Sequence, residues 1–166
     1  MTDASTLERA RTALADHAWK DAFEAFSSLP ARDLDAEDLE RLGEASWWSA
    51  HPAESLEAFE RAYAAYLAEG NKRRAAIVAL RIGLEYADRS EEVLWRAWER
   101  RALQAIEDEP DCVERGWVEI ALVRSSFDKG PQEAMRHADA ALEIAQRYGD
   151  RDLEAFAHTA QGGILV

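Results

Sequence analysis

The sequence predicts an all-α fold of about nine helices that pair into about four hairpins. The first observation is composition: only 8 Gly and 4 Pro occur in 166 residues, and strong helix formers such as Ala, Leu, Glu and Arg recur throughout. The second is a regular series of helix start and stop signals, and the third is an internal repeat. Hydrophobic residues make up 48% of the chain and charged residues 32%, so we expect a folded protein with a buried core.

Capping residues mark where several helices begin. Ser5 and Glu8 have the spacing of a capping box, in which the serine oxygen accepts a hydrogen bond from the first turn and the glutamate reaches back to the N-cap. Asp35 and Asp111 occupy later N-cap positions, where a short polar side chain accepts from an otherwise unpaired N–H. These residues indicate three of the helix starts.

Prolines and glycines mark further boundaries. Pro52 and Pro131 suit the first position of a helix, where a backbone N–H is not needed. Gly70-Asn71 and Gly149-Asp150 each combine a helix stop with the N-cap of the next helix. Together the signals predict helices over residues 5–18, 20–28, 36–50, 52–69, 72–88, 91–107, 112–128, 131–148 and from 151 onward.

The internal repeat has a period of 79 residues, the distance from Pro52 to Pro131. The same shift superposes the two glycine stops and places Trp48 on Phe127. Half of this period is about 40 residues, a length typical of a helical hairpin in repeat proteins. The repeating unit is therefore predicted to be a hairpin that occurs about four times.

A motif of small and aromatic residues indicates the type of hairpin. The segment SLEAFERA, Ser55 to Ala62, begins twelve residues after Gly43 of the pair Leu42-Gly43, and AMRHADAA, Ala134 to Ala141, is a related copy. Small residues at such positions let two antiparallel helices approach closely. The spacing and residue types resemble the tetratricopeptide repeat (TPR). This resemblance implies a right-handed α-helical solenoid of TPR-like hairpins and a single repeat domain over residues 1–166.

The third hairpin departs from the TPR pattern. Between Ile77 and Leu103, Trp95 and Trp98 occupy positions that normally hold small residues, so the register of this hairpin stays open. We expect both rings and Trp117 to fill space between helices, because large aromatic side chains most often belong to a core. Trp19 is expected to pack within the first hairpin.

A narrower resemblance covers most of the chain. The run from Leu34 to Ile82 is similar to the repeat region of actinobacterial LuxR-type transcriptional regulators. The resemblance implies regulation through binding, transfers no ligand residue, and includes no counterpart of that family's DNA-reading helix-turn-helix. The last predicted helix is apolar on one face and runs out at Ile164-Leu165-Val166. Both a truncated chain and a homo-oligomer that buries this helix therefore stay open.

The net charge of −13 restricts the partners. Nucleic acids and anionic membranes attract clustered Lys and Arg, whereas Arg73-Arg74 and Arg100-Arg101 stand among glutamates. No apolar run approaches the roughly 18 residues of a spanning helix, no signal peptide is visible, and a single cysteine, Cys112, excludes an intramolecular disulfide framework. We therefore expect a cytoplasmic protein that does not bind nucleic acid directly with this segment.

Candidate catalytic and metal-binding residues are few. Glu133–His137 and Glu154–His158 are pairs one helical turn apart on helices expected to be neighbours, but such surface pairs are usually solvated and match no diagnostic metal motif. Cys112 lies at a helix N-terminus, yet no histidine or second cysteine lies near it in sequence. No Gly-rich phosphate loop, GxSxG or HExxH occurs. The sequence therefore predicts no enzyme, no metal and no cofactor.

The adjacent Trp47 and Trp48 are the main candidate contact residues. On a helical wheel Trp47 lies beside the stripe of core residues and is expected to belong to the scaffold. Trp48 lies opposite that stripe, on the face of Glu37, Arg41 and Glu44. The matching face of the later repeat copy is apolar, which favours burial of Trp48 over a place in the groove of a TPR-like stack. If Trp48 is exposed, these four residues form the candidate partner-binding surface.

The predicted function is non-catalytic binding of a protein or peptide by a TPR-like scaffold, within a bacterial transcriptional or signalling regulator. An acidic groove favours a basic partner segment because complementary charges attract. The alternative is a small-molecule-sensing helical domain, with an aromatic-lined pocket between hairpins that biases the oligomeric state of a regulator.

Overall fold

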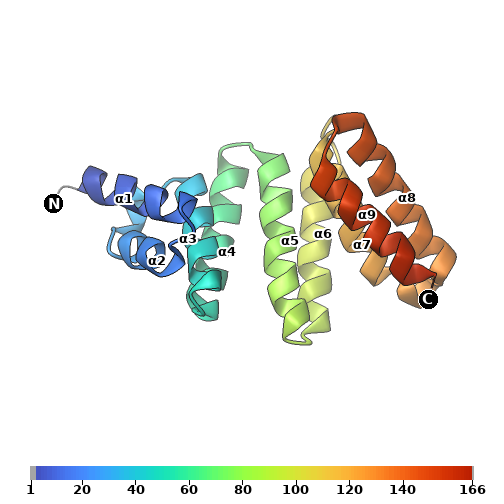
Figure 1. Cartoon of the computed structure of the whole chain (residues 1–166), viewed down its shortest axis with the longest axis horizontal. Helices are drawn as coiled ribbons and strands as arrows, with labels where there is room; N and C mark the ends of the chain where they lie inside the picture. Colours follow the sequence, from blue (N-terminus) through green and yellow to red (C-terminus); the bar gives the residue numbers. More distant parts are fainter. Residues whose placement is uncertain (1–2, 166) are drawn as a thin grey trace. The chain divides into compact units, whose positions relative to one another are not determined.

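The computed structural model describes residues 3–165, and every regular element in that range is helical (Figure 1). Its α-helices are α1 (Asp3–Ala15), α2 (Trp19–Ser27), α3 (Ala36–Trp48), α4 (Pro52–Ala68), α5 (Lys72–Asp88), α6 (Glu92–Ile106), α7 (Val113–Ser125), α8 (Pro131–Tyr148) and α9 (Arg151–Ile164). Two 3-10 turns, η1 (Ala31–Asp33) and η2 (Phe127–Lys129), add to them. The all-α prediction is confirmed. Within this range no helix is both long and apolar enough to cross a bilayer.

The contacts between helices divide the chain into two compact units. Unit 1, residues 1–71, contains α1–α4: α1 pairs with α2, α3 pairs with α4, and α2 also packs on α3. Unit 2, residues 72–166, contains α5–α9: α5 pairs with α6, α7 pairs with α8, and α9 packs on both α8 and α7. The hairpin pairing predicted from the repeat is present in each unit.

Asp35 and Asp150 cap helices as predicted. The carboxylate of Asp35 accepts from the backbone N–H of Asp38 at 2.8 Å. The carboxylate of Asp150 accepts from the N–H groups of Asp152 and Leu153 at 3.1 and 2.9 Å. Both predicted prolines stand at the start of a helix, and both predicted glycine stops have a positive φ. Local signals therefore placed these boundaries correctly.

Two predicted N-caps are wrong. The first helix already includes Asp3, so Ser5 lies within its first turn and not at the N-cap position, where a side chain could cap the helix. Helix α7 begins after Cys112, which is its N-cap and makes no side-chain capping bond. Asp111 lies one residue earlier, and its carboxylate forms an ion pair with Arg147 of α8. A tertiary partner thus replaces the expected cap.

Close packing in the α3–α4 hairpin depends on Gly43. A Cβ at this position would lie 2.7 Å from the ring of Phe59, so glycine lets the ring reach the backbone of α3. The hydroxyl of Ser55 donates to the carbonyl of Gly43 at 2.9 Å, and Ser55 and Ala62 are fully buried. The predicted role of the small–aromatic–small motif is confirmed.

The α5–α6 hairpin accommodates two tryptophans by leaving space on the opposite helix. Trp95 and Trp98 are buried, as predicted. A Cβ at Gly83 would lie 3.3 Å from the ring of Trp95 and 3.6 Å from Trp98 Cβ. The small residue that is missing from α6 is therefore supplied by α5, which explains why the TPR pattern fails there. In the next hairpin, Trp117 is half-buried and packs against the cluster around Ile144.

Candidate functional site

Trp48, the last residue of α3, is 58% exposed, so the prediction that favoured its burial is wrong. That prediction relied on the apolar face of the later repeat copy. Phe127, the residue that the repeat places on Trp48, lies beyond α7 in η2 and is itself 54% exposed. Trp47 is half-buried. The helical wheel separated the two tryptophans correctly, whereas the comparison between repeat copies was misleading.

Aromatic rings from three segments meet around Trp48. Trp19, the first residue of α2, stacks on it with ring centroids 5.8 Å apart and planes 26° apart. His17, in the α1–α2 turn, lies 4.9 Å from Trp19. A second contact joins α2 to the start of α4, where Phe23 and His51 stack at 4.0 Å. Sequence reasoning placed Trp19 only within the first hairpin and missed this tryptophan pair, because the two residues are far apart in the chain.

The four predicted contact residues lie along α3, and they are called the α3 face below. Glu37 and Trp48 are exposed, whereas Arg41 and Glu44 are half-buried. Arg41 forms an ion pair with Glu37 and donates a second hydrogen bond to Asp38 at 3.1 Å. The only base of the face is therefore neutralised within its own helix, and the face as a whole is acidic.

A buried carboxylate fixes α3 against α1. Asp38 is 1% exposed and accepts two hydrogen bonds from the guanidinium of Arg11, at 2.9 and 2.8 Å. Burial alone would raise the pKa of Asp38, but the hydrogen bonds from Arg11 and Arg41 outweigh it, so the pKa is lowered. The sequence offered no sign of this pair beyond a carboxylate at a helix start. It holds the helix that carries the α3 face in place.

The negative charge is concentrated in unit 1. Residues 1–71 contain six Lys and Arg and fifteen Asp and Glu, a net charge of −9, which leaves −4 for residues 72–166. A field of one sign attracts partners of the opposite charge and raises their association rate. The exposed tryptophan therefore belongs to the more acidic unit.

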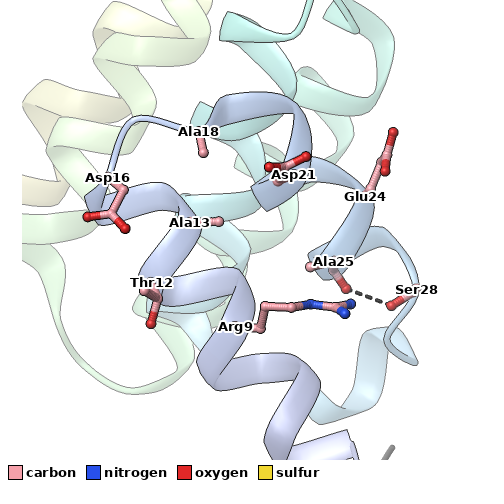
Figure 2. A pocket seen from close by; sticks show the side chains of 9 residues that line it. All are labelled: Arg9, Thr12, Ala13, Asp16, Ala18, Asp21, Glu24, Ala25 and Ser28. Atoms are coloured by element: carbon pink, nitrogen blue, oxygen red, sulfur yellow. Dashed lines mark hydrogen bonds between the residues drawn. The ribbon is translucent and has the colours of Figure 1, made fainter.

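A cleft of about 720 Å³ opens between α1 and α2 (Figure 2). Most of its polar lining is exposed, and the hydroxyl of Ser28 is already bonded to the carbonyl of Ala25 at 2.7 Å. The lining residues are Arg9, Thr12, Ala13, Asp16, Ala18, Asp21, Glu24, Ala25 and Ser28. Small-molecule sites are mostly apolar and enclose their ligand, whereas this cleft is lined largely by exposed polar side chains.

His137 contacts two carboxylates. Its Nδ1 lies 2.6 Å from Glu119 of α7, and its Nε2 lies 3.8 Å from Glu133 on its own helix. In the second pair, Glu154–His158, the histidine makes a different contact: its Nδ1 lies 3.1 Å from Oε1 of Gln161. Across residues 3–165, no three or more His, Cys, Asp or Glu side chains converge in a way that could hold a metal ion. The His137 group links α7 and α8.

Two titratable groups are buried in unit 2. Cys112 is 2% exposed, and burial raises the pKa of its thiol. Glu99 accepts a hydrogen bond from the hydroxyl of Ser125 at 2.6 Å, but burial outweighs this bond and raises the pKa of the carboxyl. Neither group lies on the α3 face. A buried thiol whose pKa is raised has the character of a packing residue rather than of a nucleophile.

Comparison with known proteins identifies the architecture. No protein-family model matches the sequence, and no curated protein matches it. The solved structure of MamA MSR-1 C2 matches with a TM-score of 0.57 and 15% sequence identity, over 98% of this chain and 95% of that chain. Likeness at this identity concerns the fold, which for MamA is a TPR-like helical solenoid. The chain thus has the all-α fold of a TPR-like helical solenoid.

Proposed function

We propose that the chain is a non-catalytic protein-interaction scaffold that binds a basic protein or peptide segment through its α3 face. The observation that carries the proposal is Trp48, a large aromatic side chain that is 58% exposed in a unit with a net charge of −9. Aromatic residues are enriched among the side chains that dominate binding energy at protein interfaces. A partner that covers such a ring gains the free energy of burying its apolar surface.

The electrostatics of the α3 face favour a basic partner. Glu37 and Glu44 lie on the same side of α3 as Trp48, and Arg41 is held by Glu37 and Asp38. A basic segment that lies along this side would meet acidic side chains and an aromatic anchor, whereas an acidic segment or a nucleic acid would be repelled. The TPR-like fold supports this role, because solenoids present extended surfaces for binding.

The regulatory setting is part of the same proposal. The resemblance of residues 34–82 to LuxR-type regulators supports a role in a cytoplasmic transcriptional or signalling system, in which the repeats bind a partner and another component reads DNA. The test is a reporter gene controlled by a transcriptional regulator that occurs together with this chain. Reporter output is compared between the unaltered chain and its Trp48→Ala variant. Equal reporter output from both proteins would contradict it.

Self-association through α9 is a separate part of the proposal. Phe156 on this helix is 55% exposed, and its ring packs edge-on against Trp117 with ring centroids 5.2 Å apart. A second copy that covers this ring would bury the apolar edge of α9. Sedimentation velocity over a concentration series should show an oligomer that Phe156→Ser weakens; a monomer at all concentrations would contradict it.

Binding of a fluorescent Lys- and Arg-containing peptide, followed by anisotropy, tests the proposed function. We expect affinity that falls as salt is added, because exposed charges are screened. The double variant Glu37→Gln/Glu44→Gln should bind about threefold to tenfold more weakly, which corresponds to the modest energy of charged contacts at an interface rim. A matched control, Glu107→Gln/Glu143→Gln, removes two exposed acids from unit 2 and should leave the affinity unchanged. Equal losses in both variants would show a general charge effect and contradict the α3 face.

A further inference from the structure

We propose that the pair of Trp19 and Trp48 is the site where the basic partner inserts an arginine side chain, which stacks on the exposed ring of Trp48. The inference rests on the proposed function and names the group that the α3 face recognises. Trp48 is 58% exposed although Trp19 already lies against it at 5.8 Å. Trp19 therefore covers part of the indole, and more than half of the Trp48 side chain is left exposed to a ligand.

The tryptophan pair is organised before any partner arrives. Trp19 is the first residue of α2 and Trp48 is the last residue of α3, so both side chains are attached to regular helices. His17 supports Trp19 from the α1–α2 turn at 4.9 Å, and the Arg11–Asp38 pair fixes α3 on α1. A ring held in this way loses little freedom when it is bound, which lowers the cost of association.

Arginine and tryptophan already pair within the described part of unit 2. Arg101 lies over the ring of Trp98 at 4.2 Å, and Arg124 lies over Trp95 at 5.9 Å. Both rings are buried, so these contacts are structural. No cation is recorded over Trp48 among the residues that the structure describes. The exposed tryptophan thus offers the surface that an arginine of another molecule would occupy.

Several features favour arginine over an apolar anchor or lysine. Tryptophan gives the strongest attraction to a cation placed over an aromatic ring. The guanidinium is flat and weakly hydrated, so it stacks on a ring more readily than the compact ammonium of lysine. Glu37 and Glu44 on the same face, together with the charge of −9 on unit 1, add attraction for a cation. An apolar side chain placed on Trp48 would gain nothing from this charge.

Four fluorescent peptides, identical except for one central residue, test the inference on the unaltered protein. Each has Gly-Ser spacers and flanking lysines, and the central residue is arginine, lysine, citrulline or leucine. Citrulline keeps the shape of arginine but removes its charge. We expect arginine to bind about threefold more tightly than lysine and about tenfold more tightly than citrulline, as a cation over tryptophan predicts.

Protein variants assign the effect to the tryptophan pair. Trp48→Ala should weaken the arginine peptide about tenfold and bring it level with the citrulline peptide, and Trp48→Phe should retain part of the preference. Phe127→Ala removes an equally exposed ring from unit 2 and should change nothing. Far-UV circular dichroism checks that each variant is folded.

The outcomes separate this inference from the proposed function. If all four peptides bind the unaltered protein equally, or the leucine peptide binds best, the arginine site is wrong. The basic-partner function would then still stand if Glu37→Gln/Glu44→Gln weakens binding. If no basic peptide binds the unaltered protein at low salt, both proposals are wrong.

Discussion

Replacement of Arg11 by methionine is expected to destabilise the protein by about 2–3 kcal/mol near neutral pH. Removal of one partner from a buried ion pair costs roughly 3–5 kcal/mol, because a charge is left without compensation. Asp38 is 1% exposed and would lose the two hydrogen bonds at 2.9 and 2.8 Å. The cost is reduced because Arg41 keeps its bond at 3.1 Å and because the Arg11 side chain is 33% exposed.

Neutralisation of the acid should cost less than removal of the base. Asp38→Asn leaves Arg11 with Glu8 and Arg41 with Glu37, so no charge is stranded in the interior and a loss of about 1 kcal/mol is expected. Urea unfolding followed by circular dichroism gives both values. Hydrogen exchange of peptides from α1 and α3 should show faster opening in Arg11→Met. Arg32→Met, which removes an 84% exposed arginine of the same unit, is the control and should be neutral.

The pH dependence provides a second check on the same ion pair. The pKa of Asp38 is lowered in the folded protein because the guanidinium hydrogen bonds outweigh the effect of burial. The stabilisation is therefore complete above the pKa of the unfolded chain, about 3.9, and is lost as the pH falls through the lower folded value. The difference between the wild-type protein and Arg11→Met should be largest near neutral pH and narrow in acid. A difference that does not change with pH, or a larger loss in Asp38→Asn than in Arg11→Met, would refute this reasoning.

Three further predictions concern buried residues within each of the two units. Gly43→Ala places a Cβ 2.7 Å from the ring of Phe59 and should destabilise by about 1–3 kcal/mol in urea unfolding; no loss would show that the ring moves freely. Glu99→Gln keeps an acceptor for Ser125. At pH values above the raised pKa of Glu99, the variant should have a higher melting temperature than the native protein, because only the native protein then buries a charged carboxylate. This gain should vanish on acidification, and a gain that persists would contradict its cause. Cys112, 2% exposed with a raised thiol pKa, should react with a thiol reagent slowly in the folded protein and rapidly in urea; fast labelling of the folded protein would contradict its burial.

The candidate site was only partly predictable. The helical wheel placed Glu37, Arg41, Glu44 and Trp48 on one face because the periodicity of a helix is a local property. The exposure of Trp48 depended on which helices cover that face, and the stack with Trp19 required α2 to pack on α3. Neither is encoded in the spacing of residues along one helix.

The sequence by itself determined the helices and their pairing. Caps at Asp35 and Asp150, prolines at helix starts and glycines at helix ends act within one or two turns, so the boundaries follow from local hydrogen bonding and backbone freedom. The small residues of each hairpin likewise follow from the need for close approach, as Gly43 and Phe59 show.

Only the tertiary structure decided which side chains those helices bury, pair or leave exposed. Arg11 and Asp38 meet across helices, Gly83 rather than a residue of α6 makes room for Trp95, and Trp48 stays open to solvent. Such outcomes depend on the positions of neighbouring helices in space, because burial and charge pairing are set by all the atoms around a group rather than by its place in the chain.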